Sequence, residues 1–207
     1  MALVKSIGAV VLFNALILTN SILAGIRKDD ITFYFQERIG VTFFSALILG
    51  CTAVVCFILS RLYRLLDEKN PFINFWLFSA IGFFYLCMDE YFMIHEGMDR
   101  AILKLLGQDP RLYNFDGWIL AFFGVIGVWL FFKYARELLQ YKGFLVHFWL
   151  GVFFFSLMVL FDQVFHFGET GMVIEDSFKL VGVCFLFAGY VNALLSMQER
   201  ALEPRKG

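Results

Sequence analysis

Six apolar stretches dominate the sequence, and each is long enough to cross a lipid bilayer. They cover approximately residues 3–25, 41–64, 72–95, 117–139, 145–168 and 177–198. A membrane-spanning helix needs about 20 mostly apolar residues. The breaks between the stretches contain the charged, glycine and proline residues that are typical of helix ends and loops. The sequence therefore predicts an all-α, polytopic membrane protein in which residues 1–207 form a single bundle of six transmembrane helices.

The composition agrees with this interpretation and excludes one class of partner. Hydrophobic residues make up 60% of the chain, and its mean hydropathy is +0.75, whereas a soluble domain is typically about half apolar. The first apolar stretch is longer than the core of a signal peptide, so we expect it to be an uncleaved span. The net charge of -1, with no basic tract, argues against a nucleic-acid partner. Membrane lipids are the expected surroundings.

The distribution of charge predicts how the bundle lies in the membrane. Six spans place both termini on one side, and that side carries ten of the 17 Lys and Arg residues. Because loops rich in Lys and Arg stay in the cytoplasm, both termini are predicted to be cytoplasmic in the cell inner (plasma) membrane. The opposite, periplasmic side carries 13 of the 18 Asp and Glu residues. We therefore expect the polar chemistry of the protein on the periplasmic face.

Helical spacing selects the residues that could form a site on that face. Asp162, His166 and Glu169 follow one another at i, i+4 and i+7, so a helix presents them on one stripe. Asp89 and Glu96 are likewise seven residues apart. A regular helix would place His95 off that second stripe, unless the chain already turns there. Ionisable groups this close to the bilayer core are costly, so they are expected to face the bundle interior and to have partners.

The same two segments also suggest an internal duplication. The stretches DEYFMIHE (89–96) and DQVFHFGE (162–169) share the pattern D-[E/Q]-x-F-x-x-x-E without a gap. Both predicted helices run in the same direction through the membrane. The third and fourth spans are therefore a possible duplicate of the fifth and sixth, related by a pseudo-twofold axis along the membrane normal.

Imidazole and carboxylate groups that converge from two helices suggest a metal site. A donor set of nitrogen and oxygen suits a divalent transition metal, and it does not distinguish zinc, iron, manganese and copper. The predicted ligands are the following residues: Asp89, His95, Glu96, Asp162, His166 and Glu169. Glu175 and Lys179, at the start of the last span, are the predicted catalytic residues that would tune this centre.

The same residues also fit roles that involve no metal. The polar set could form a metal-free hydrogen-bonded network, or its members could be unrelated. Asp176 could cap the last span, and Lys179 could form a structural ion pair with Glu175, Asp176 or Asp162. Asp99, Asp109 and Asp116 are assigned to solvated loops, and His147 is assigned to the membrane interface.

Three stretches of the sequence, CMDEYFMIHE, FFFSLMVLFDQ and IEDSFKLVGVCFLFAGY, carry a resemblance. They resemble uncharacterised bacterial inner-membrane proteins with six helices, whose recurrent features are an LDE-x4-HE-like segment, a later intramembrane Asp and an ED-x-x-K-x-x-G helix start. The corresponding residues here are Asp89, Glu90, His95 and Glu96, then Asp162, then Glu175, Asp176, Lys179 and Gly182. The resemblance covers approximately residues 72–192. It implies a six-helix membrane protein and no activity.

These observations leave two functional hypotheses of different classes. The first is a metal-dependent hydrolase or oxidoreductase that acts on a membrane substrate at the periplasmic face. The second is a non-catalytic structural or accessory subunit of a larger membrane complex, with other membrane subunits as partners. A transporter is disfavoured, because no proline interrupts the apolar stretches and no ionisable group lies at the predicted bilayer midplane.

Overall fold

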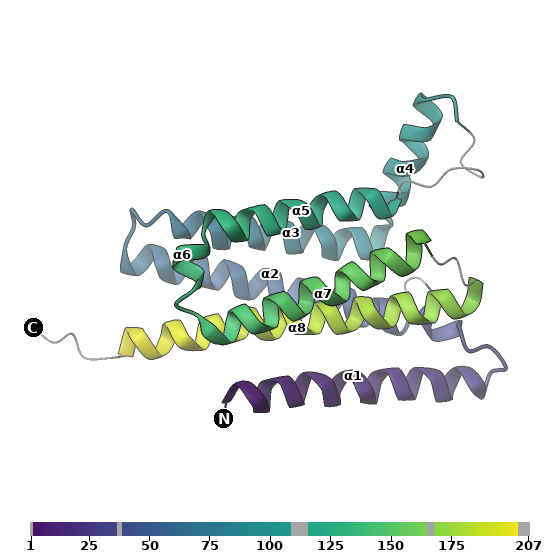
Figure 1. Cartoon of the computed structure of the whole chain (residues 1–207), viewed down its shortest axis with the longest axis horizontal. Helices are drawn as coiled ribbons and strands as arrows, with labels where there is room; N and C mark the ends of the chain where they lie inside the picture. Colours follow the sequence, from purple (N-terminus) through teal and green to yellow (C-terminus); the bar gives the residue numbers. More distant parts are fainter. Residues whose placement is uncertain (1, 37–38, 109–115, 165–167, 203–207) are drawn as a thin grey trace, which may run out of the picture.

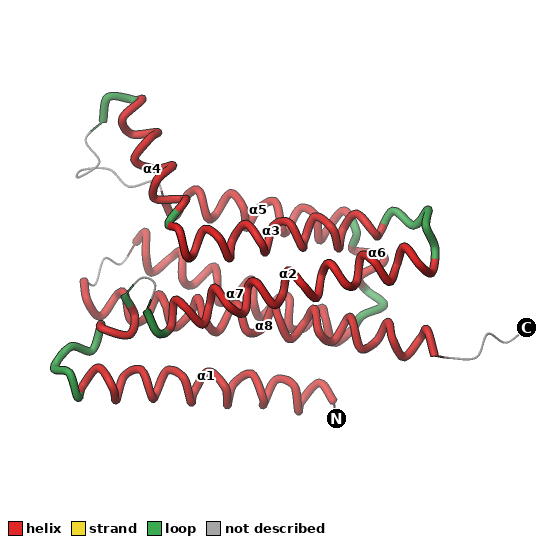
Figure 2. The backbone as a smooth tube through the Cα atoms, turned by 180° about the vertical axis from the view of Figure 1, so that it is seen from behind, coloured by secondary structure: helices red, strands yellow, loops and turns green. Residues whose placement is uncertain are grey.

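The computed structural model describes residues 2–36, 39–108, 116–164 and 168–202. These residues form helices joined by short turns (Figures 1 and 2). The helices, in chain order, are α1 (Ala2–Ile26), the short 3-10 helix η1 (Phe33–Phe35), α2 (Val41–Leu66), α3 (Phe72–Phe92), α4 (Ile94–Leu105), α5 (Asp116–Lys133), α6 (Ala135–Leu138), α7 (Lys142–Val164) and α8 (Gly168–Leu202). The predicted all-α class is therefore confirmed.

Five of these helices are long and apolar enough to cross a membrane. Their spanning parts are Leu3–Ile26, Val41–Leu66, Phe72–Phe92, Gly143–Phe161 and Thr170–Glu199. They indicate a multi-pass membrane protein. The sixth predicted span, residues 117–139, corresponds to α5 and α6. Its described apolar part, Ala121–Lys133, is shorter than the other five, although α5 runs back along the bundle in Figure 1.

Three predicted helix boundaries were wrong. The span predicted to end at residue 95 ends at Phe92, because Met93 adopts a left-handed conformation. The span predicted to reach residue 139 divides at Tyr134, where φ is −109° and ψ is 14°. The last helix was predicted to start at residue 177, but it starts at Gly168 and has 35 residues. At about 1.5 Å per residue it is about 52 Å long, and it therefore extends beyond a bilayer core of about 30 Å.

Aromatic side chains hold α3 against the last two long helices. Trp76 of α3 is fully buried. Its ring lies 6.0 Å from that of Phe144 on α7 and 5.7 Å from that of Tyr190 on α8. Edge-to-face pairs at such distances contribute about 0.5–1.5 kcal/mol each beyond their buried area. This cluster of rings fixes the position of α3 within the bundle.

Two glycines allow α7 and α8 to approach each other closely. A Cβ atom added to Gly151 would lie 2.7 Å from the side chain of Leu186 and 3.1 Å from the carbonyl oxygen of Gly182. A Cβ atom added to Gly182 would in turn lie 2.9 Å from the ring of Phe155. Small residues are common where membrane helices cross, because they let the backbones come together. Gly182, the last residue of the ED-x-x-K-x-x-G motif, therefore has a packing role.

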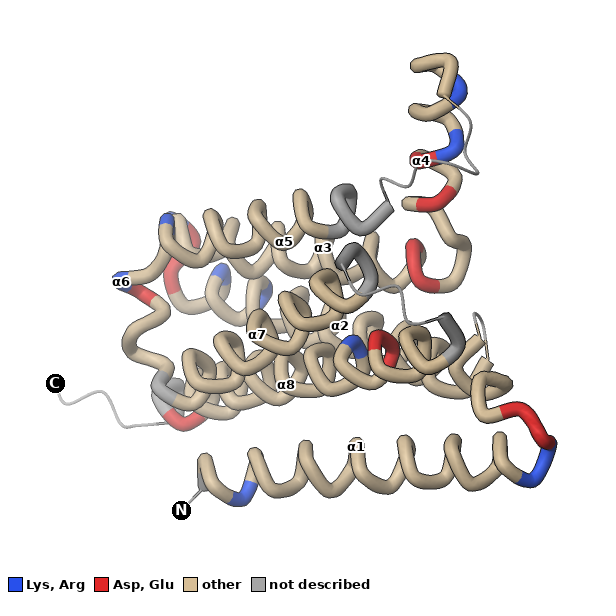
Figure 3. Tube along the Cα trace, turned by 45° about the vertical axis from the view of Figure 1, so that its right-hand side comes forward, with Lys and Arg blue, Asp and Glu red and all other residues tan. Residues whose placement is uncertain are grey.

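Among the long helices, α2 packs chiefly on α3, α7 packs chiefly on α8, and α2 also contacts α8. The helix α1 lies along one side of the bundle, and only 17% of its apolar window is buried (Figure 1). Acidic residues occur at the end of α3, on α4 and on the first part of α8 (Figure 3). The internal duplication stays a prediction.

Candidate functional site

A break in the helix at Met93 creates the first part of the site. Met93 has φ 56° and ψ 46°, a left-handed conformation that is uncommon for a residue other than glycine. Its backbone N–H donates to the carbonyl oxygen of Asp89 at 2.7 Å, which closes the last turn of α3. The chain then starts α4 in a new direction. The turn brings His95 back toward α3 instead of continuing the original helix.

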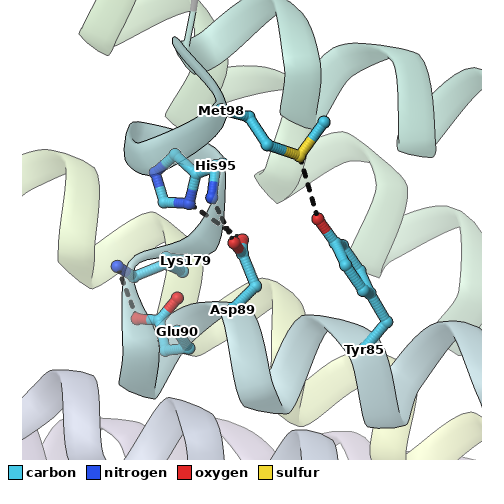
Figure 4. A network of polar contacts seen from close by, with 6 residues as sticks. All are labelled: Tyr85, Asp89, Glu90, His95, Met98 and Lys179. Atoms are coloured by element: carbon cyan, nitrogen blue, oxygen red, sulfur yellow. Dashed lines mark hydrogen bonds and ion pairs between the residues drawn. The ribbon is translucent and has the colours of Figure 1, made fainter. Parts of the chain in front are cut away.

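Asp89 binds His95 through both carboxylate oxygens. The backbone N–H of His95 donates to Oδ1 at 2.6 Å, and Nδ1 of its ring lies 2.8 Å from Oδ2 (Figure 4). Asp89 is only 2% exposed. Its carboxylate therefore satisfies a backbone donor in the first turn of α4 and also orients the imidazole. Because a carboxylate only accepts, Nδ1 carries the proton, and a neutral His95 ring has its lone pair on Nε2.

The second part of the site is an ion cluster that joins α3 to α8. The ammonium group of Lys179 lies 2.7 Å from Oε1 of Glu90 and 2.7 Å from Oδ1 of Asp176. The three side chains are 17%, 12% and 8% exposed, respectively. With all three groups ionised, the cluster has a net charge of −1. A charge in such surroundings is tolerated only when it is paired, so each of these groups depends on the others.

Asp89 and Glu90 are consecutive, and this connects the two parts. Adjacent residues of a helix point about 100° apart. Glu90 therefore reaches Lys179, whereas Asp89 reaches His95 at the start of α4 (Figure 4). We call the five residues Asp89, Glu90, His95, Asp176 and Lys179 the polar centre.

The structure corrects the spacing argument for the third predicted span. Asp89 and Glu96 were expected on one stripe of one helix, but Met93 separates them into α3 and α4. Glu96 lies 3.6 Å from Arg100, within α4. His95, which a regular helix would have placed off the stripe, is instead the partner of Asp89.

Two further assignments from the sequence were wrong. Asp176 does not cap the last helix, because α8 begins eight residues earlier, at Gly168. Asp99 is not a solvated loop residue, since it lies within α4 and is 8% exposed. Lys179 does form an ion pair with Asp176, as one of the alternatives predicted, and its second partner is Glu90.

The predicted metal ligands are only partly visible in the structure. The side chains of Asp162, His166 and Glu169 lie outside the described residues, as does Asp109. Among the residues that are described, no group of three or more His, Cys, Asp or Glu side chains could hold a metal ion. Asp89 contacts His95, and both Glu90 and Asp176 contact Lys179. Glu175, a predicted catalytic residue, is half-buried on α8 beside Asp176.

Glu90 is the member of the polar centre to which the sequence assigned no role. It belongs to the motif that carries the resemblance, but it does not share a helical stripe with the other predicted site residues. Its partner, Lys179, is far away in the sequence. The signal that could have identified it is the presence of two consecutive carboxylates near the end of a span, because at most one of them can face any single neighbour.

His147 was assigned to the membrane interface, and the structure places it in the protein interior. It is fully buried on α7. Its Nδ1 lies 2.7 Å from the carbonyl oxygen of Gly143, and its Nε2 lies 3.1 Å from the hydroxyl of Ser6 on α1. This histidine therefore ties α1 to α7.

Comparison with known proteins gives a family and no activity. None of the curated proteins and none of the solved structures matches the chain. One family profile, described as a domain of unknown function (DUF8692), matches residues 7–193, which include the whole polar centre. The chain belongs to the DUF8692 family.

Proposed function

We propose that the protein crosses the cell inner membrane six times, with both termini in the cytoplasm and the polar centre at the periplasmic face. Five helices with membrane-spanning character support the proposal, and α5 supplies the sixth crossing. The excess of Lys and Arg on the terminal side supports the proposed orientation. In this arrangement the ends of α3 and α7 and the beginning of α8 lie near the outer boundary of the membrane.

The polar centre, in this proposal, is the active site of a metal-dependent hydrolase or oxidoreductase that acts on a membrane substrate. The observation that carries it is the Asp89–His95 pair. A buried carboxylate that holds Nδ1 orients the ring and raises the basicity of Nε2, as the hydrogen-bonded partners of metal-binding histidines commonly do. Such an imidazole can bind a divalent transition metal or accept a proton.

The remaining ligands of the proposed metal are Asp162, near the end of α7, Glu169, at the start of α8, and His166, which lies between them in the sequence. Zinc, iron, manganese or copper would supply Lewis acidity and an activated water molecule, or a redox centre. The ion cluster of Glu90, Asp176 and Lys179 then has a positioning role, because it fixes the end of α3 against α8. Glu175 directly precedes Asp176 in the sequence.

Metal analysis of the purified protein tests this function. We expect a stoichiometric transition metal in the wild-type protein and its loss in the variants His95→Ala and His166→Ala. Glu199→Gln is the matched control, because Glu199 is an exposed carboxylate near the opposite end of α8 and should leave the metal content unchanged. A wild-type protein that contains no metal after purification without chelators would contradict the proposal.

The second candidate function is an accessory subunit, and the position of α1 favours it. Only 17% of the apolar window of α1 is buried within the chain, which is the lowest fraction among the five spanning helices. A neighbouring subunit could cover the rest. If the protein is an accessory subunit, it co-purifies with a stable partner complex. Loss of the partner then abolishes the activity of the complex, whereas substitution of His95 does not.

A further inference from the structure

The helix α4 leaves the bundle at the point where α3 reaches its end. The left-handed turn at Met93 redirects the chain, and α4 then runs across the axis of the bundle instead of along it (Figures 1 and 2). It has 12 residues, which corresponds to about 18 Å at 1.5 Å per residue. Since α3 has the length and hydropathy of a membrane span, α4 begins at the level of a membrane surface.

The two faces of α4 differ in chemistry. Met98, Ile102, Leu105 and Leu106 follow the spacing i, i+4, i+7 and i+8, so they form one stripe. All four are exposed, by 41%, 39%, 87% and 60%, respectively. On the opposite face Arg100 and Lys104 are also exposed. An apolar stripe open to its surroundings, with basic residues opposite, is the pattern of a helix that lies in a lipid interface.

One contact shows which way the stripe faces. The Tyr85 hydroxyl donates to Sδ of Met98 at 3.7 Å. Tyr85 lies on α3, about two turns before its end, so it belongs to the spanning part of that helix. In Figure 4 the Met98 side chain points from α4 toward this tyrosine. The stripe therefore begins on the side of α4 that faces the membrane-embedded part of α3.

We propose that α4 is an interfacial helix whose Met98–Leu106 stripe is buried in the headgroup and acyl boundary of the leaflet where α3 ends. The partner is a lipid surface, since the stripe continues the apolar surface of a spanning helix and is turned toward it. Arg100 and Lys104 face the aqueous side. The assignment does not depend on a metal or on an activity. It places His95, in the first turn of α4, at the depth of the lipid headgroups.

The test measures the surroundings of each face in a bilayer. Single cysteines replace Ile102 on the stripe and Lys104 on the opposite face, and each carries a nitroxide spin label. In both variants Cys51 and Cys87 are changed to alanine, whereas Cys56 and Cys184 are buried and stay in place. The protein is reconstituted in nanodiscs of phosphatidylethanolamine and phosphatidylglycerol. Collision of the label with oxygen, which concentrates in lipid, is compared with collision with a water-soluble nickel chelate.

We expect the label at position 102 to collide several-fold more with oxygen than with the chelate, and the label at position 104 to show the reverse. Equal collision with the chelate at both positions would overturn the proposal, because the stripe would then face water. Protection of position 102 from both reagents would also overturn it, since a protein surface or a second copy of the chain would then cover the stripe. Leu105→Cys on the stripe and Arg100→Cys on the opposite face repeat the comparison at a second pair of positions, in case labelling of the first pair disturbs folding.

Discussion

Replacing Lys179 by methionine should destabilise the protein strongly. Lys179 is the cation that lies 2.7 Å from both Glu90 and Asp176, and the two carboxylates are 12% and 8% exposed. Methionine preserves most of the length of the side chain and removes the charge. The variant therefore leaves two carboxylates close together, largely buried and without their common counterion.

The expected magnitude follows from the burial of the cluster. Removal of one partner from a buried ion pair costs about 3–5 kcal/mol, because the remaining charge is uncompensated. For a chain of this size, 1 kcal/mol corresponds to about 2–4 °C in Tm. We therefore expect Lys179→Met to lower the apparent Tm in detergent by about 6–20 °C, measured by thiol-reactive fluorescence as Cys56 and Cys184 become accessible. Lys104→Met, at an exposed position on α4, is the matched control and should change stability by no more than about 0.5 kcal/mol.

A triple variant separates the charge effect from the loss of packing. Glu90→Gln and Asp176→Asn, combined with Lys179→Met, remove all three charges and preserve the approximate shapes of the side chains. Because neutral replacement of a buried ion cluster is often tolerated, the triple variant should recover most of the lost stability. If Lys179→Met unfolds at the wild-type temperature, or if the triple variant is no more stable than Lys179→Met alone, the buried charges do not stabilise each other as described.

Three other changes test separate parts of the fold. Met93→Val should be about 1–2 kcal/mol less stable than Met93→Gly, because a β-branched residue resists a positive φ and glycine does not. Thermal unfolding of the two variants measures this difference, and the opposite order of stability would contradict the left-handed turn at Met93. Gly182→Leu should lower stability by about 1–3 kcal/mol through overpacking, measured in the same way, whereas Gly124→Ala, where an added Cβ meets nothing within 4 Å, should be neutral or slightly stabilising. Glu96→Gln breaks an ion pair in which the Arg100 side chain is 61% exposed. The free energy of unfolding, measured by chemical denaturation, should therefore fall by less than about 1 kcal/mol. A larger loss of stability would assign Glu96 a buried role.

Most of the helices could be predicted from the sequence because their signal is strong and local. A stretch of about 20 apolar residues has few alternatives to a membrane helix. The boundaries were less predictable. The segment GETGMVIED has the composition of a loop, yet it is helical from Gly168 onward. Tertiary contacts can hold residues of low helix propensity in a helix. A prediction from propensity alone does not include the energy of those contacts.

The polar centre was predicted in part, and the missing part has one physical cause. Spacing arguments assume a regular helix, and the left-handed residue in this segment is Met93, a type that favours helices and rarely adopts positive φ. No local sequence pattern predicts the left-handed turn at this residue. Its consequences follow directly: His95 joins Asp89, and Glu96 turns toward Arg100. The Glu90–Lys179 pair was missed for a different reason, since it joins residues on helices that are distant in sequence.

The ¹⁵N NMR spectrum of the His95 ring in the intact protein tests the Asp89–His95 pair directly. In the structure Asp89 holds His95 through Nδ1, so that the chemistry of the ring takes place at Nε2. With ¹⁵N-labelled histidine, and with His147 and His166 assigned by single substitutions, His95 should show a protonated, hydrogen-bonded Nδ1 that loses this signature in Asp89→Asn. An unprotonated Nδ1 in the wild-type protein, or a His95 signal that does not change in Asp89→Asn, would contradict the account.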